Sequence, residues 1–375
     1  GFELLQNHLR HVYQFVFPDY VNIENVSPLH KTDAANADFR LPPDINARLT
    51  ADYFNSLAFS RKAHTALATL AGKAPHPHGI FVGGTTTNMT IIEFNEVTSI
   101  LNEIKNFVEV SLIPDMYIIA SYYSDYYEMG RGYGNFLCYG LYDNPAFPVK
   151  FAFPGVIING VKEDVVDTGA MIEDLRFTWA NAPGDVIIPG DNLVTPDATK
   201  PDAYSWVSAP RYRGYPMEVG PLARMYINGY YTRGISAMDR LIARTLETLR
   251  ICECMQGLLE IIRLEPAYQE RWPIPVTARG IGRTEASRGA LTHWLDIGNS
   301  VVSNYTLMPP SSWNLSPRDN NEIRGPVEEA LIGTYIKDML HPVEIGRIVR
   351  SFDPCLNCAA HVTSDRHSPL TIRII

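Results

Sequence analysis

The chain has 375 residues, of which 46% are hydrophobic and 19% charged, and its formal net charge is −9. This length is enough for a large core, and the composition is typical of a globular protein rather than a disordered or membrane-spanning one. The negative charge argues against a protein that binds nucleic acid or an anionic membrane over much of its surface. No apolar run approaches the roughly 20 residues of a transmembrane helix, and no signal peptide opens the sequence.

Helical periodicity dominates the first two thirds of the chain. Four segments have apolar residues at helical intervals, namely residues 2–13, 48–72, 90–125 and 235–264. The last of them is predicted to be a buried central helix. In contrast, residues 145–180 contain short β-branched runs with Asn159-Gly160 as a turn signal, which predicts a small strand and hairpin region.

The carboxy-terminal third begins with a loop-like segment and then shows strand patterning. Residues 291–308 contain two apolar runs divided by Gly298-Asn299, which predicts a hairpin. Helices are predicted again at residues 327–339 and 342–352. The expected fold class is therefore mainly α with peripheral β-hairpins (α+β), in a single compact body because no internal repeat or low-complexity linker divides the chain.

The cysteines are too few and too unevenly spaced for a disulfide scaffold. Cys252 and Cys254 lie two positions apart on the predicted central helix and point in different directions, so they are interpreted as packing residues. Cys138 stands among apolar residues and is interpreted in the same way. Metal binding or simple burial is left for Cys355 and Cys358.

The strongest chemical signal is DPCLNCAAH near the end of the chain. Asp353 is a favoured N-cap and Pro354 is tolerated at a first helical position, so a helix is predicted to start there. Cys355, Cys358 and His361 follow at intervals of three and would share one stripe of that helix. A helix amino terminus favours thiolates, which suit nickel, iron or zinc. Spacing alone leaves open a half zinc site, a thioredoxin-like redox pair or two buried thiols.

This motif resembles the carboxy-terminal DPCxxCxxH signature of nickel–iron hydrogenase large subunits. GIGRTEASRGALTHW at residues 280–294 is similar to the family's GxGxxEAPRGALxHW stretch. Further similar segments follow in family order: SRKAH at 60–64, GKAPHP at 72–77, GYGNFL at 132–137, EVGPLAR at 218–224 and WNLSPRD at 313–319. The resemblance implies a large-subunit helical core and an oxidoreductase that cleaves H2 reversibly and heterolytically, in the uptake direction.

The resemblance also implies roles for individual residues. Cys355 and Cys358 would be nickel thiolates, the first terminal and the second bridging to an iron that carries cyanide and carbon monoxide. His361 would bind a nearby magnesium or iron ion; otherwise it is a histidine on a helix surface. Arg288 matches the arginine that the family places over the active site; otherwise it forms an ordinary loop salt bridge. Asp353 would pair with Arg288 as well as cap the helix, and capping alone stays open.

Two departures from the family pattern bear on oxygen tolerance and catalytic bias. Ser287 stands where the family often has Pro. Asn7 stands where it often has Asp, so it keeps hydrogen bonding but loses the charge that would pair with Arg288. The sequence indicates neither the electron acceptor nor the cellular compartment.

The other two nickel thiolates belong to an RxCGxC motif that is absent from these residues and is expected upstream of Gly1. By themselves the residues are therefore expected to be inactive. Residues 1–361 are expected to form the large-subunit body, and residues 362–375 the peptide that a maturation protease removes after nickel insertion.

Expected partners are that protease, nickel-insertion factors and a small subunit that holds all the iron–sulfur clusters. The alternatives are a hydrogen sensor or another non-catalytic relative, and a zinc or thiol-redox module built on Cys355 and Cys358.

Overall fold

The computed structural model describes residues 1–15, 38, 40–81, 84–190, 194–265, 273–339, 342–355, 359–362 and 370–373. The chain divides into two compact units. Unit 1 comprises Gly1–Tyr123, Tyr142–Phe151 and Leu241–Pro273, and unit 2 comprises Ser124–Leu141, Ala152–Arg240 and Ile274–Ile375. Within the described residues, no helix combines the length and the apolar character that a membrane crossing requires.

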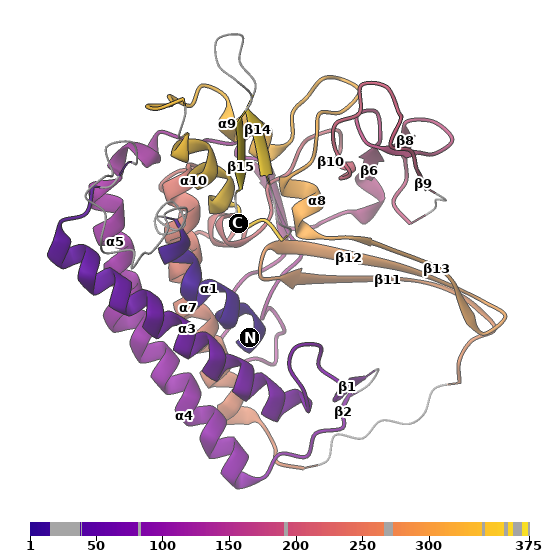
Figure 1. Ribbon diagram of the computed structural model, residues 1–375. Helices are drawn as coiled ribbons and strands as arrows, with labels where there is room; N and C mark the ends of the chain where they lie inside the picture. Colours follow the sequence, from indigo (N-terminus) through magenta and orange to yellow (C-terminus); the bar gives the residue numbers. More distant parts are fainter. Residues whose placement is uncertain are drawn as a thin grey trace. The chain divides into compact units, whose positions relative to one another are not determined.

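Unit 1 is built mainly from helices, which Figure 1 shows as long coiled ribbons. They are α1 (Phe2–Gln14), α3 (Pro43–Ala71), α4 (Ile91–Phe107), α5 (Ile113–Tyr122) and the part of α7 (Ala237–Ile261) from Leu241 onward. Helix α3 packs against both α1 and α4. These helices confirm the four segments predicted from periodicity. A short hairpin of β1 (Ile80–Phe81) and β2 (Gly84–Thr85) completes the unit.

The segment from α4 to α5 was predicted as one helical stretch over residues 90–125. Local chemistry explains where this stretch begins and where its helical geometry changes. A capping box starts α4, because Thr90 and Glu93 each accept a hydrogen bond from the backbone N–H of the other. Between α4 and α5 lies one π-helical stretch, η2 (Val108–Leu112). Pro114 follows at the start of α5 and has no N–H for a regular helical bond, which the wider turn before it accommodates.

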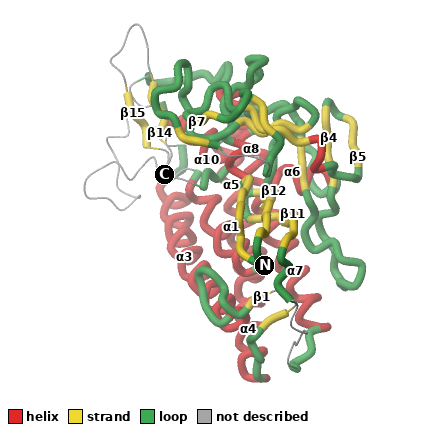
Figure 2. The backbone as a smooth tube through the Cα atoms, turned by 90° about the vertical axis from the view of Figure 1, so that its right-hand side faces the viewer, coloured by secondary structure: helices red, strands yellow, loops and turns green. Residues whose placement is uncertain are grey.

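Unit 2 consists of small antiparallel sheets and short helices, seen in Figure 2 as yellow and red segments among green loops. The first sheets join β3 (Phe136–Cys138), β4 (Gly155–Ile158) and β5 (Val161–Glu163); β10 (Ala209–Tyr212), β6 (Met171–Asp174) and β8 (Val186–Ile187); and β7 (Ala180–Asn181) with β9 (Thr195–Pro196). The turn Asn159-Gly160 joins β4 to β5, which confirms the predicted hairpin.

The short helices of unit 2 are η3 (Ser124–Tyr127), η4 (Thr168–Ala170), α6 (Pro221–Ile227), α8 (Pro310–Asn314), α9 (Pro326–Leu331) and α10 (Val343–Ser351), beside the first turn of α7. Helix α10 confirms the prediction for residues 342–352. The helix predicted over residues 327–339 is wrong beyond Leu331, because Ile332 is extended and Gly333 adopts a left-handed φ of 76°.

The largest sheet of unit 2 is a meander of β11 (Thr277–Ala286), β12 (Gly289–Gly298) and β13 (Val301–Met308). Asn299 and Ser300, with φ of 54° and 62°, form the turn of the predicted β12–β13 hairpin, which is confirmed. The loop predicted before residue 291 is wrong, because β11 occupies it. Gly280 and Gly282 have low strand propensity, so the sequence did not predict this strand. In the structure, Gly280 pairs with Leu295 and Gly282 with His293 of β12.

The core of unit 2 lies where the meander meets the smaller sheets. It contains Leu137, Val156, Val166, Met171, Tyr212, Met217, Val219, Ala290, Trp294, Met308 and Trp313. Helices with small antiparallel sheets match the predicted fold class, which is confirmed. The β11–β12 turn, at one end of the meander, is the place where the sequence motifs meet.

Candidate active site at the β11–β12 turn

Arg288 lies in the two-residue turn between β11 and β12, because Ala286 pairs with Gly289 across it. The guanidinium of Arg288 holds Asp353 by two contacts. Its Nε donates to the backbone carbonyl oxygen of Asp353 at 2.8 Å, and its Nη2 lies 3.3 Å from Oδ1 of the same residue. The Arg288 side chain is 25% exposed and that of Asp353 is 8% exposed. Asp353 thus fixes the guanidinium through Nε and Nη2, while part of the Arg288 side chain stays accessible to solvent.

A second arginine lies beneath this turn and is completely buried. Nη1 of Arg224, on α6, donates to Oε2 of Glu285 at 2.6 Å, and both side chains are 0% exposed. The same guanidinium donates to the carbonyl oxygens of Ala286 and Ser287, each at 3.1 Å. The other oxygen of Glu285 accepts the backbone N–H of Tyr139 at 2.8 Å. Arg224 therefore holds the two carbonyls that immediately precede Arg288.

Two glycines allow α6 to approach the turn this closely. A Cβ on Gly220, whose φ is 115°, would lie 2.7 Å from the carbonyl oxygen of Arg288. A Cβ on Gly289, whose φ is 129°, would lie 2.5 Å from the backbone nitrogen of Gly220. Any other residue would meet both a steric clash and an unfavourable backbone conformation. The segments EVGPLAR and EASRGAL therefore meet at this turn.

The helix predicted to begin at Asp353-Pro354 is wrong. Helix α10 ends at Ser351, and Asp353 has a left-handed φ of 54° with its N–H donating to the carbonyl of Arg350 at 2.9 Å. Asp353 therefore follows the end of one helix instead of capping another, and its partner is Arg288. The shared helical stripe is wrong as well, since Ala359–Val362 form β14, paired with β15 (Leu370–Arg373).

Of the predicted metal ligands, the structure describes the side chain of Cys355. This thiol is exposed, two positions after Asp353, and the backbone N–H of Cys355 donates to Oγ of Ser311 on α8 at 3.2 Å. Cys358 and the side chain of His361 lie outside the described residues. Among the side chains that are described, no three of His, Cys, Asp or Glu gather around a point that a metal ion could occupy. An exposed thiol two positions after the residue that fixes a guanidinium nevertheless fits a thiolate-bound metal centre.

The other cysteines have the structural role that was predicted for them. Cys138, Cys252 and Cys254 are buried. Burial raises the pKa of Cys252 to about 12 and that of Cys254 to about 11, so both stay protonated thiols. Asn7 is buried on α1 in unit 1, so the predicted loss of a charge beside Arg288 stays a prediction.

Arg224 and Glu285 were not predicted as site residues, although both stand in segments that resemble the family. The available signal was a charged residue inside an otherwise apolar or small-residue run, as in GPLAR and TEAS. Such residues are rarely buried unless they are paired. Their partners could not be assigned, because the two residues are 61 positions apart.

Comparison with known proteins shows which family the chain belongs to. The family model for nickel-dependent hydrogenases matches residues 5–259 and 231–361. The chain belongs to the nickel-dependent hydrogenase family. It is similar to the periplasmic [NiFeSe] hydrogenase large subunit of Desulfomicrobium baculatum, with 34% identity over 96% of this chain and 77% of the relative. It is also similar to the uptake hydrogenase large subunit of Rhizobium leguminosarum bv. viciae, with 30% identity over 92% of this chain and 69% of the relative.

Solved structures of hydrogenases share the fold. A reduced, active form of the Ni-Fe-Se hydrogenase from Desulfomicrobium baculatum superposes with a TM-score of 0.87 at 32% identity, over 94% of this chain and 79% of that one. The as-isolated oxidized enzyme from D. vulgaris Hildenborough gives 0.85 at 31% identity, over 94% and 78%. This chain is thus a hydrogenase large subunit, an oxidoreductase acting on H2 in a family that carries a nickel–iron centre and pairs with a small subunit.

Proposed function

We propose that this large subunit oxidises hydrogen in the uptake direction, with Cys355 as a terminal nickel ligand and Cys358 as a ligand that bridges nickel and iron. A bound nickel–iron centre, with cyanide and carbon monoxide on its iron, would supply heterolytic cleavage of H2. His361 would bind a magnesium or iron ion close by. The observation that carries this proposal is the pairing of Arg288 with Asp353, which stands two positions before Cys355.

Arg288 would act on the reaction as a fixed positive charge. Its two contacts with Asp353 hold the planar guanidinium in place. A charge that is already oriented favours the separation of charge in heterolysis without reorganisation during the step. The Asp353 carboxyl would act as a positioning group for this guanidinium.

The proposal extends to assembly and maturation. A small subunit would hold the iron–sulfur clusters that receive the electrons, and nickel-insertion factors would load the site. Residues 1–361 would form the mature body after a protease removes residues 362–375.

The test uses the full-length large subunit, coexpressed with its small subunit and maturation factors. We expect nickel and iron in the purified heterodimer, H2 uptake with an artificial electron acceptor, and a mass that ends at His361. Zinc without nickel or iron would contradict the metal assignment. Metal without H2 uptake would favour a hydrogen sensor, and an active enzyme that retains Ile375 would refute the maturation step.

A further inference from the structure

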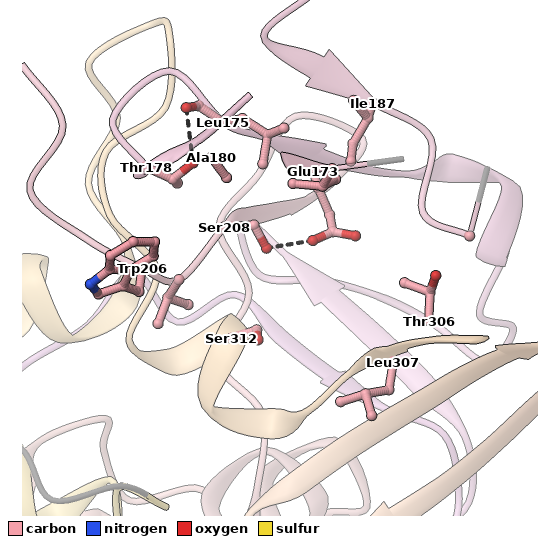
Figure 3. Close-up of a pocket in the computed structure, with 13 residues that line it drawn as sticks. Glu173, Leu175, Thr178, Ala180, Ile187, Trp206, Ser208, Thr306, Leu307 and Ser312 are labelled. Carbon is pink, nitrogen blue, oxygen red and sulfur yellow. Dashed lines mark hydrogen bonds between the residues drawn. The ribbon is translucent and has the colours of Figure 1, made fainter. Parts of the chain in front are cut away.

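Unit 2 contains a cavity of about 270 Å³ that shares no residue with the candidate active site. Figure 3 shows it between β6, β8 and β13, with the segment at Trp206–Ser208 and helix α8 on its other sides. Its walls are mostly apolar, formed by Leu175, Ala180, Ile187, Val194, Trp206, Val207 and Leu307. Hydroxyl groups come from Thr178, Ser208, Thr306 and Ser312. This is a binding-site composition of apolar walls with a few polar groups.

Glu173, on β6, is the one charged residue among the described residues that line this cavity. Figure 3 shows its carboxylate directed into the cavity beside the Ser208 side chain, and the Ser208 hydroxyl donates to Oε2. The next residue, Asp174, accepts backbone N–H groups of Arg176 and Asn320 instead. Burial raises the pKa of Glu173, and the Ser208 hydrogen bond offsets this only in part. The cavity therefore surrounds a carboxylate whose negative charge one neutral hydroxyl helps to stabilise.

Two basic side chains lie near the cavity, but their hydrogen bonds go to acceptors other than Glu173. Nζ of Lys200 donates to the carbonyl oxygens of Leu175 at 2.6 Å and Ala180 at 3.0 Å, and it lies 3.3 Å from Asp185. Nη2 of Arg279 donates to the carbonyl oxygen of Gly190 at 3.0 Å. Neither of them contributes to the pKa of Glu173. A cation for this carboxylate would therefore come from outside the described residues.

We propose that the cavity binds the guanidinium or primary ammonium group of an organic cation with a short apolar stem. A carboxylate in apolar surroundings forms strong charge-assisted hydrogen bonds with such groups. The aliphatic walls suit the methylene groups of the stem.

The cation has two possible carriers with the same chemistry, a free small molecule or an arginine or lysine side chain of the small subunit. Either would also contact helix α8, which links the cavity to the active site. Ser312 of this helix lines the cavity, while the preceding residue, Ser311, accepts the backbone N–H of Cys355. The proposal does not depend on the direction or rate of hydrogen oxidation.

The experiment measures binding of n-butylguanidinium to the assembled heterodimer by titration calorimetry, with n-butylurea as an uncharged analogue of the same shape. We expect the urea to bind at least about tenfold more weakly. Glu173→Gln keeps an acceptor for Ser208 but removes the charge, so it should weaken guanidinium binding about 10- to 100-fold, the usual range for a charged hydrogen bond. Glu260→Gln, at an exposed position on α7, is the matched control and should change nothing.

A second variant tests the same site by filling it. Ser208→Lys would place an ammonium group of the chain itself against Glu173, so guanidinium binding should be lost while the protein stays folded. If wild-type heterodimer binds no guanidinium but Glu173→Gln weakens association of the subunits at least tenfold, the small subunit supplies the cation. Equal binding by wild type and Glu173→Gln would overturn the proposal. So would an absence of guanidinium binding together with unchanged subunit association.

Discussion

Two arginine–carboxylate pairs flank the β11–β12 turn, and they differ in burial and in what they hold. Arg224 and Glu285 are fully buried and also satisfy three backbone groups. Arg288 and Asp353 are 25% and 8% exposed. Buried charges are tolerated only with a complete set of partners, whereas a partly exposed pair adds little stability. The difference indicates that the buried pair shapes the turn and that the outer pair is available for chemistry.

The most severe test of this comparison removes the buried arginine. Arg224→Met leaves the Glu285 charge buried without its guanidinium, so we expect the free energy of unfolding to fall by about 3–5 kcal/mol. Urea denaturation followed by circular dichroism measures this. Arg213→Met breaks the exposed Arg213–Glu163 pair of the same unit and should destabilise the protein far less than Arg224→Met does. Equal losses in the two variants would contradict the scaffold role of Arg224.

The outer arginine should show the opposite pattern. Arg288→Gln removes the fixed charge beside Cys355, so we expect H2 uptake to fall about 10²- to 10³-fold, as for other preorganised donors. Unfolding free energy should change by no more than about 1 kcal/mol, and nickel and iron content should be unchanged. Arg131→Gln, at an exposed arginine of unit 2, is the control and should keep full activity. Loss of the metals from Arg288→Gln would instead indicate a role in assembly.

Asp115 of unit 1 extends the comparison to a buried carboxylate with an exposed partner. It accepts hydrogen bonds from Tyr13 at 2.7 Å and Arg48 at 2.8 Å, but the Arg48 side chain is 51% exposed. Burial raises the pKa of Asp115 from 3.8 to about 6, and the pairing does not offset it. The folded state thus binds the proton more tightly than the unfolded chain, so this stabilisation is present below pH 4 and is lost as pH rises through 6.

The expected loss between those pH values is about 3 kcal/mol, at 1.36 kcal/mol for each pKa unit. Urea denaturation at pH 4, 5, 6 and 7 measures it. Asp115→Asn cannot ionise and should lack this decline. Its free energy of unfolding should therefore rise relative to that of wild type as the pH increases. Parallel pH profiles for the two proteins would contradict the shifted pKa.

The smallest effect is expected at Asp353. Asp353→Asn removes the charge 3.3 Å from Nη2 of Arg288 but keeps the carbonyl that accepts Nε at 2.8 Å. The guanidinium should stay near its position, so H2 uptake should fall about fivefold, corresponding to about 1 kcal/mol. Comparison with Arg288→Gln under identical assay conditions measures the ratio. A loss as large as that of Arg288→Gln would assign the carboxyl a direct part in the reaction.

Several elements could be predicted from the sequence because their signals are local. The helices of unit 1 carry apolar residues at helical intervals over many turns, and the hairpin turns at Asn159-Gly160 and Asn299 have residues that favour a positive φ. Strand β11 was not predicted, because its two glycines and three charged residues are more typical of a loop than of a strand. Only its pairing with β12 shows that it is a strand.

The end of the chain shows the limits of a motif. Asp353-Pro354 has a favourable sequence for a helix start, but the same residues also suit the turn that follows α10. In the structure the residues form this turn, and Asp353 then contacts Arg288, which is 65 positions away in the sequence. A local capping preference is worth about 1 kcal/mol, which tertiary contacts readily exceed.

The sequence by itself determined the family and the helical core, because each depends on motifs or on short-range periodicity. Only the tertiary structure decided which charges meet. It paired Arg224 with Glu285, set Arg288 against Asp353 and placed Glu173 in the wall of a mostly apolar cavity. The physical reason is that burial and ion pairing depend on segments brought together by folding, and the spacing of residues along the chain does not specify those partners.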